Sequence, residues 1–128
     1  MLHDRKFYKC AVCGNIVGMI HEAGPKVVCC NQEMGLMVPN TVDAAKEKHV
    51  PVAVRNGNLL EVQVGSVLHP MLEEHHIAWI LVAGRDWTQR VSLPHTGSPV
   101  ASFCLPDEDA VSVYEYCNLH GLWATDCD

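Results

Sequence analysis

The residues most able to do chemistry in this chain are its seven cysteines and eight histidines. Four cysteines lie in the first third of the sequence, as the C-x-x-C pair Cys10 and Cys13 and the adjacent pair Cys29 and Cys30. In a reducing compartment this spacing favours metal ligation, and a disulfide between adjacent cysteines would need a strained ring. Soft thiolates in a tetrahedral set select zinc or iron, and the spacing alone leaves both metals open.

A second set of candidate ligands lies in the rest of the chain. It consists of four histidines and one cysteine: His49, His69, His75, Cys117 and His120. Cys117 and His120 form a C-x-x-H motif, whose two side chains can reach one ion from a single turn. Any one of these histidines alone would more often be a solvated residue than a ligand. Four imidazoles and a thiolate together exceed the needs of structural zinc and leave an octahedral metal with one open position, which indicates a metal centre that does chemistry.

The elements that must position these ligands differ between two parts of the chain. Residues 1–37 have few long apolar runs, so a bound metal would have to supply much of their folding free energy. From about residue 49, short β-rich runs alternate with turn residues, as in an antiparallel sandwich. The predicted strands cover residues 50–55, 59–64, 77–82, 88–93, 100–105 and 111–117. Asn56-Gly57 suits a hairpin turn, and residues 42–48 suit a loop or one helical turn leading into His49.

The predicted fold is therefore mainly β, with a small metal-stapled domain over residues 1–37 and a β-sandwich over residues 38–128. The net charge of −6 and only nine scattered Lys and Arg residues argue against binding nucleic acid. No apolar run approaches the roughly 18 residues that would span a bilayer, and the first residues lack the apolar stretch of a signal peptide. We therefore expect no membrane association and a cytoplasmic location.

Taken together, these motifs resemble the desulfoferrodoxin family. The resemblance covers nearly the whole chain, because separate motifs occur in the same order and at compatible spacings. They are Cys10-x-x-Cys13, Cys29-Cys30, Glu47-Lys48-His49-Val50-Pro51, His69-Pro70-Met71, His75 and Cys117-Asn118-Leu119-His120-Gly121. The resemblance implies two iron ions per chain, one in a desulforedoxin-like domain with four cysteine ligands and one in an immunoglobulin-like sandwich of the neelaredoxin type.

The same resemblance implies a superoxide reductase, an enzyme that reduces superoxide to hydrogen peroxide with electrons from an external donor such as rubredoxin. It places the four histidines in a square around the catalytic iron and Cys117 on the axis. Lys48 would attract the anionic substrate, and Glu47 would occupy the sixth position in the oxidised state. It also implies a homodimer. The alternatives are an electron-transfer protein without an open position, a zinc-stabilised binding module and a superoxide dismutase.

Some residues depart from the family pattern or lie outside both ligand sets. Asn31 stands where glycine is common in the family, and His76 stands where an aromatic residue is usual. His75 is preferred over His76 as the ligand, because adjacent residues on a strand point to opposite faces. Cys104 is expected to be a buried small hydrophobe and Cys127 a mobile tail thiol. The histidines without partners in the sequence are expected on the surface: His3, His21 and His95.

Overall fold

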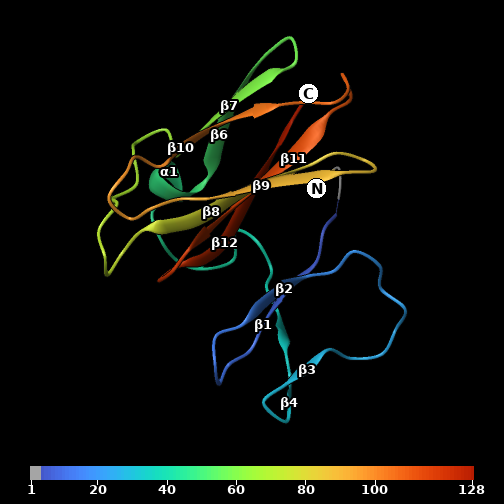
Figure 1. Cartoon of the computed structure of the whole chain (residues 1–128). Helices are drawn as coiled ribbons and strands as arrows, with labels where there is room; N and C mark the ends of the chain where they lie inside the picture. The colour runs from blue at the N-terminus through green and yellow to red at the C-terminus, as the bar shows by residue number, and fades with distance from the viewer. Residues whose placement is uncertain (1–3) are drawn as a thin grey trace. The chain divides into compact units, whose positions relative to one another are not determined.

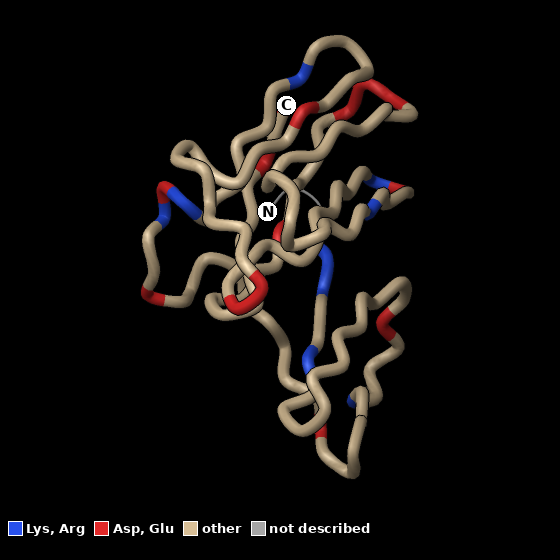
Figure 2. The backbone as a smooth tube through the Cα atoms, turned by 60° about the vertical axis from the view of Figure 1, so that its left-hand side comes forward, with Lys and Arg blue, Asp and Glu red and all other residues tan. Residues whose placement is uncertain are grey.

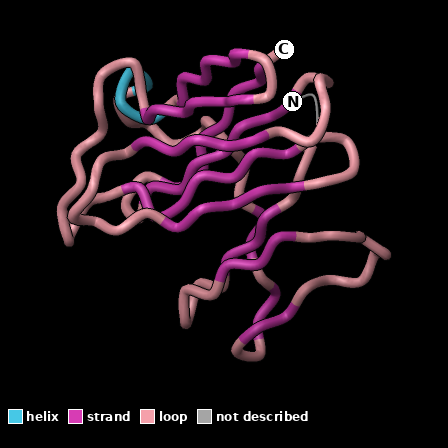
Figure 3. The backbone as a smooth tube through the Cα atoms, turned by 45° about the horizontal axis from the view of Figure 1, so that its top comes forward, coloured by secondary structure: helices cyan, strands magenta, loops and turns pink. Residues whose placement is uncertain are grey.

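The computed structural model describes residues 4–128, and residue contacts divide this stretch into two compact units, Asp4–Val38 and Pro39–Asp128. His3, expected on the surface, lies outside the described residues. Figure 3 shows that the regular structure is almost entirely strand, with one short helix. The prediction of a mainly β fold with a cysteine-rich N-terminal part is confirmed. Within residues 4–128, no helix is long and apolar enough to cross a membrane.

The smaller unit holds five short strands (Figure 1). They are β1 (Phe7–Lys9), β2 (Ile16–Gly18), β3 (Val28–Cys29), β4 (Gln32–Glu33) and β5 (Gly35–Leu36). β1 pairs antiparallel with β2 and β5, and β3 and β4 form a separate hairpin. The buried hydrophobic residues described in this unit are Phe7, Cys10 and Met34. So few buried side chains cannot offset the entropy of ordering about 35 residues, so a metal is needed to hold the unit together.

The larger unit contains one helical turn and seven strands. They are α1 (Lys46–His49), β6 (Pro51–Asn56), β7 (Leu59–Val64), β8 (Ile77–Ala83), β9 (Thr88–Ser92), β10 (Val100–Cys104), β11 (Val111–Cys117) and β12 (Gly121–Cys127). Strands β10, β7 and β6 form one antiparallel sheet in that order, and β12, β11, β8 and β9 form the other. The predicted β6–β7 hairpin is present, although its two-residue loop is Gly57-Asn58 because Asn56 still pairs with Leu59.

The core of the larger unit lies between its two sheets. Alternate side chains of β7, β8, β10 and β11 meet there, as expected for strands that bury one face. Among the fully buried members are Leu60, Ile80 and Val113. Cys117 belongs to the same cluster, so the end of β11 carries a thiol from the core into the metal site described below. The core therefore anchors one of the candidate ligands directly.

Two expectations about cysteines are wrong. Cys127 lies in β12 and pairs with Val111, so it is part of a sheet and not of a mobile tail. Cys104 is exposed, because it follows the buried Phe103 on β10 and alternation turns its side chain outward. Strand β12 itself was not predicted from the sequence; it exists because its backbone pairs along the whole of β11.

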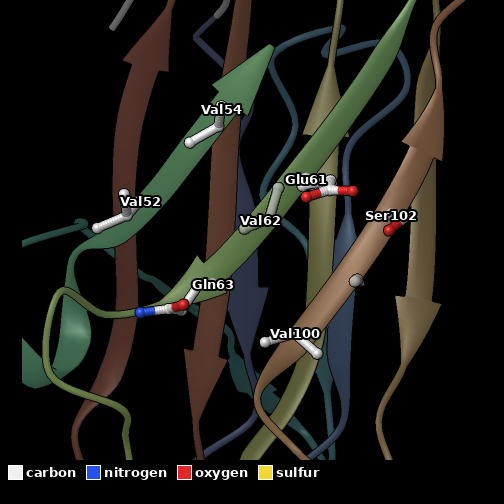
Figure 4. A pocket seen from close by; sticks show the side chains of 8 residues that line it. Val52, Val54, Glu61, Val62, Gln63, Val100 and Ser102 are labelled. Carbon is white, nitrogen blue, oxygen red and sulfur yellow. The ribbon is translucent and has the colours of Figure 1, made fainter. Parts of the chain in front are cut away.

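The outer face of the β6–β7–β10 sheet carries a shallow hollow (Figure 4). Outward-facing side chains line it in two rows across the three strands: Val52, Gln63 and Val100 in one, Val54, Glu61 and Ser102 in the other. None of the candidate metal ligands lines this hollow. Lys and Arg positions are spread along the backbone of both units (Figure 2).

Candidate metal centres

The four cysteines of the small unit converge on one point. The sulfur atoms of Cys10, Cys13, Cys29 and Cys30 all lie within 4.8 Å of one another. The Cys13 and Cys29 sulfurs are 3.6 Å apart, and those of Cys29 and Cys30 are 3.9 Å apart. A tetrahedral ion with metal–sulfur bonds of about 2.3 Å would separate its sulfurs by about 3.8 Å. The spacing therefore fits one ion shared by four thiolates.

The adjacent pair reaches the ion through an unusual turn. Cys30 and Asn31 connect β3 to β4, and both have left-handed backbones, with φ of 53° and 59°. Asparagine is among the few residues other than glycine that adopt this conformation at low cost, which accounts for Asn31 at a glycine position. The Asn31 departure thus preserves the turn. The side-chain amide of Asn15 donates to the sulfur of Cys29 at 3.6 Å, which supports a thiolate there.

Electrostatics also favour a cation in the four-cysteine cluster. The backbone N–H groups of Cys13 and Val12 point at the Cys10 sulfur and lower the pKa of that thiol to about 6. The neighbouring sulfurs of Cys13, Cys10 and Cys29 raise the pKa of Cys30 to about 12. Four thiolates therefore cannot coexist here without a positive ion between them.

The four histidines of the larger unit form a square. Ring centroids of successive pairs are 4.7 Å apart for His49 and His69, 4.5 Å for His69 and His75, 5.1 Å for His75 and His120, and 4.9 Å for His120 and His49. The diagonal between His49 and His75 is longer, at 6.5 Å. Successive rings are close to perpendicular. This is how imidazoles surround one ion in a plane.

Hydrogen bonds fix which nitrogen of each ring faces the centre. Nδ1 of His49 donates to the Ala45 carbonyl at 2.7 Å, and Nδ1 of His69 donates to the Pro70 carbonyl at 2.7 Å. A carbonyl can only accept, so these nitrogens carry the protons and the Nε2 lone pairs are free for a metal. Burial lowers the pKa of His49, and lowers that of His69 to about 4, so both rings are neutral near pH 7.

The other two rings also present a nitrogen to the centre. Nε2 of His75 is buried and has no hydrogen-bond partner within residues 4–128, so its lone pair is available to a metal. Nδ1 of His120 lies 3.1 Å from Nε2 of His49 and 3.9 Å from the Cys117 sulfur. Two nitrogens bound at right angles through bonds of about 2.1 Å lie about 3 Å apart. His120 therefore faces the centre through Nδ1 and the other three rings through Nε2.

Cys117 approaches the square from the interior. Its sulfur is fully buried and lies 3.5 Å from Nε2 of His69. Ligand atoms of His49, His69, His75 and Cys117 all lie within 4.8 Å of one another. Burial raises the pKa of the Cys117 thiol, and the backbone N–H groups of Leu119 and His120 oppose that rise. A register shift between Tyr116 and Cys117, where β11 pairs with β8, accompanies this placement.

Helix α1 carries the candidate ligand His49, and Glu47 and Lys48 precede it on the same turn. The Glu47 carbonyl accepts hydrogen bonds from the backbone of Val67 and the hydroxyl of Ser66. Gly65 lies so close to α1 that an added Cβ would come within 2.7 Å of the Glu47 oxygen, so only glycine fits. Trp123 stacks on the His49 ring at 4.9 Å and donates its indole N–H to the His120 carbonyl. Trp123 thus contacts the ring of one ligand residue and the backbone of another.

Exposure differs across the square. His49 and His69 are each only 2% exposed, whereas His75 and His120 are half-buried and Glu47 and Lys48 are exposed. The sulfur of Cys117 lies on the core side. The side of the square at His75 and His120 is therefore the one more open to solvent.

The sequence reading missed one buried polar residue beside this centre. Glu115 is fully buried on the core-facing row of β11, two residues before Cys117, and its two carboxylate oxygens have no hydrogen-bond partner within the described chain. Burial raises its pKa to about 9, so the side chain is a neutral acid near pH 7. The sequence contained a signal for this burial, because Glu115 occupies every-second-residue spacing with Val111, Val113 and Cys117.

The histidines left outside the ligand sets have different surroundings. His21 is exposed, as expected. His75 belongs to the ligand cluster and His76 does not, because the His76 ring turns back to the carbonyls of Leu72 and Glu73. His95 is exposed, as expected, and its ring lies 5.9 Å from that of His76.

The donor sets fit iron. Four thiolates in a tetrahedron bind iron or zinc, whereas four imidazoles and one thiolate with an open side exceed what zinc takes. The orphaned Nε2 of His75 and the proton-bearing Nδ1 atoms of His49 and His69 are arranged for metal binding, so the residues present accommodate the ion.

Known proteins show the same organisation. Residues 41–126 match the family Desulfoferrodoxin, and residues 3–37 match the family of its N-terminal domain. A desulfoferrodoxin homolog from Archaeoglobus fulgidus is 50% identical over 123 residues, covering 96% of this chain and 98% of the relative. A desulfoferrodoxin from Nitratidesulfovibrio vulgaris is 46% identical, with 96% of this chain and 97% of the relative covered.

A solved structure agrees in its fold. The crystal structure of the superoxide reductase from Treponema pallidum superposes with a TM-score of 0.79 at 40% identity, over 96% of this chain and 99% of that one. The cysteine cluster and the histidine–cysteine cluster match the two iron centres of desulfoferrodoxin. This chain belongs to the desulfoferrodoxin family.

Proposed function

We propose that this protein is a superoxide reductase, which converts superoxide to hydrogen peroxide by adding one electron and two protons. The ligands of the reacting iron are His49, His69, His75, His120 and Cys117. The observation that carries the proposal is the one-sided arrangement of these donors: a square of four imidazoles with sulfur on the core side and half-exposed rings toward solvent. Ferrous iron bound there supplies the electron.

Cys117 acts on the reactivity of the centre. Cys117 would be a thiolate ligand of a bound iron, and it would donate electron density that favours release of a reduced oxygen product. Its burial keeps the sulfur out of reach of oxidants in solvent, and the N–H groups of Leu119 and His120 stabilise its negative charge. The protein thus protects the same atom that tunes the metal.

Lys48 draws the substrate to the centre. The chain carries a net charge of −6, which repels superoxide at long range. Burial is the main cause of the lowered pKa of His75, and the positive charge of Lys48 contributes to it, so Lys48 acts electrostatically on the site. Because charges are screened over about 8 Å at physiological ionic strength, Lys48 acts on the site more strongly than carboxylates that lie farther away than this.

Glu47 adjoins Lys48 on the exposed side of α1. A carboxylate oxygen is a suitable ligand for ferric iron, and we assign Glu47 to the sixth position in the oxidised state. The electron returns from an external donor such as rubredoxin, and the working form is a homodimer. The four-cysteine iron is a one-electron centre in the smaller unit.

Product counting tests the proposal. The reduced, iron-loaded protein is exposed to pulses of superoxide while hydrogen peroxide, oxygen and oxidised iron are measured. We expect one hydrogen peroxide and one oxidised histidine-ligated iron per superoxide, with no oxygen from the protein reaction. Oxygen release without consumption of donor electrons would instead identify a dismutase, and failure of the iron to react with superoxide would leave only electron transfer.

A further inference from the structure

His76 and His95 form a pair that the iron centres do not use. Strands β8 and β9 pair with Trp79 opposite Ser92 and Ile80 opposite Val91. The hydrogen bond from the Leu93 N–H to the Ala78 carbonyl, at 2.9 Å, continues the same register beyond the strands. Three residues past Trp79, that register places His76 opposite His95. Side chains directly opposite on antiparallel strands lie close enough to share a ligand.

The spacing of the two rings matches that of imidazoles arranged around one ion. Their centroids are 5.9 Å apart with an interplanar angle of 44°. In the histidine square, neighbouring rings lie 4.5 Å to 5.1 Å apart and the rings on the diagonal 6.5 Å apart. The distance between the His76 and His95 centroids falls between these two values, so the ring spacing is compatible with two ligands of one ion.

His76 is prepared for binding by its own hydrogen bonds. Its Nδ1 lies 2.9 Å from the Leu72 carbonyl and 3.1 Å from the Glu73 carbonyl, so Nδ1 carries the proton and Nε2 keeps a free lone pair. Its backbone N–H donates to the side-chain oxygen of Asn118 at 2.8 Å, and the amide of Asn118 donates to the Glu74 carbonyl. His49 and His69 have the same kind of hydrogen bond, from Nδ1 to a backbone carbonyl, which leaves Nε2 available to a metal.

His95 is held less tightly but in a defined place. It lies in a turn in which the Gly97 N–H donates to the Pro94 carbonyl at 3.1 Å, and its side chain is exposed. Two carboxylates, Glu73 and Glu74, are exposed beside His76. The Lys or Arg nearest to His95 in sequence is Arg90, whose guanidinium donates to the Ser92 hydroxyl at 2.6 Å.

We infer that His76 and His95 form a third metal site, at the surface, which takes a divalent transition ion such as Ni²⁺, Cu²⁺ or Zn²⁺. Imidazole is the preferred side chain for these ions, and two rings leave the remaining positions to water. The site is separate from both iron centres: its two ligands lie outside the two clusters.

The test is a calorimetric titration of the iron-loaded protein, without a histidine tag, with Ni²⁺. The variants are His95→Gln, His76→Gln and, as a matched control, His21→Gln, which removes an exposed histidine in the smaller unit. We expect one additional Ni²⁺ per chain in the native protein and in His21→Gln. Binding should weaken about tenfold or more in His95→Gln and His76→Gln, because one of two ligands is lost.

The visible spectrum of each variant is recorded beside the titration, because an unchanged spectrum shows that both iron centres and the fold are intact. His95→Gln is the decisive variant, since His95 is far in sequence from any iron ligand. The inference is overturned if His95→Gln binds Ni²⁺ as tightly as the native chain, or if the native chain takes up no additional ion.

Discussion

Nδ1 of His120 lies 3.1 Å from Nε2 of His49, although 71 residues separate them in the sequence. Trp123 holds both: it stacks on one ring and donates to the backbone of the other residue. This contact closes the histidine square, because His49 comes from α1 and His120 from the turn between β11 and β12. The site therefore depends on the packing of the sandwich as well as on the local C-x-x-H motif of Cys117 and His120.

Replacing Cys117 with serine should alter the histidine-ligated iron selectively. Serine oxygen is a harder donor than thiolate, so the oxidised centre should lose its sulfur-to-iron absorption and react with superoxide about tenfold slower or more. The measurement is the visible spectrum after oxidation, together with the superoxide rate. Cys104→Ser is the control, since Cys104 is exposed on β10. Equal spectra in the two variants would exclude Cys117 as a ligand.

Replacing Lys48 with alanine should slow the encounter with superoxide. One positive charge beside the site contributes about threefold to tenfold at low ionic strength, so the variant should lose that factor and show a flatter dependence on salt. Lys46→Ala is a matched control, because Lys46 lies exposed on the same helical turn. If the Lys48 variant keeps the native rate and salt slope, the steering role is wrong.

Asn31 offers a test of the turn beside the four-cysteine ion. Its φ is 59°, which glycine adopts without strain and alanine does not. Asn31→Gly should leave stability unchanged or raise it by up to about 0.5 kcal/mol, and Asn31→Ala should lower it by about 1 kcal/mol. Thermal unfolding of the small unit, followed through the absorption of its iron, measures both. If Asn31→Ala were more stable than Asn31→Gly, the left-handed backbone at this position would be contradicted.

Removing the metals should unfold the smaller unit alone. Its described residues bury few side chains, whereas the larger unit keeps the apolar core between its sheets. After chelation, amide hydrogen exchange should become fast in residues 4–38 and remain slow in β7, β8 and β11. Persistent protection of residues 4–38 in metal-free protein would show that the unit folds without its ion.

Glu115 predicts an alkaline loss of stability. With its pKa raised to about 9 in the folded chain, Glu115 keeps a proton that the unfolded chain releases near pH 4.5. The folded chain therefore binds more protons in this window, and its stability falls as the pH rises from 4.5 to 9, by at most about 6 kcal/mol. Glu115→Gln cannot ionise and should lose less stability over this range. The measurement is the free energy of unfolding from denaturant titrations at several pH values. An equal loss in both proteins between pH 4.5 and 9 would disprove this.

Much of the fold could be predicted from β-rich runs and turn residues. The strands near residues 59–64, 77–82 and 111–117 were predicted because short runs of strand-forming residues lie there between turn residues. Strand β12 was not, because Gly121–Cys127 mixes glycine, tryptophan and polar residues and is a strand through pairing with β11. Which residues pair across two strands depends on contacts between distant parts of the chain. For the same reason, the sequence did not show that His76 lies near His95.

The site was predictable in its residues but not in its geometry. The resemblance named the ligand set, and the structure brings those side chains together. Which ring nitrogen faces the centre depends on carbonyls such as those of Ala45 and Pro70, whose positions follow only from the folded backbone. The buried Glu115 could have been found, since it shares the core-facing row of Cys117.

The central claim is that five donors hold one iron and leave one face open to a small anion. Titrating the oxidised, iron-loaded Glu47→Ala variant with azide tests it most directly, because Glu47 is assigned to the sixth position of the oxidised native centre. The account predicts a saturable shift of the absorption of the histidine-ligated iron, with one azide per chain, while the absorption of the four-cysteine iron stays constant. A spectrum that does not change at any azide concentration would contradict the claim, because it would mean that protein ligands fill every position.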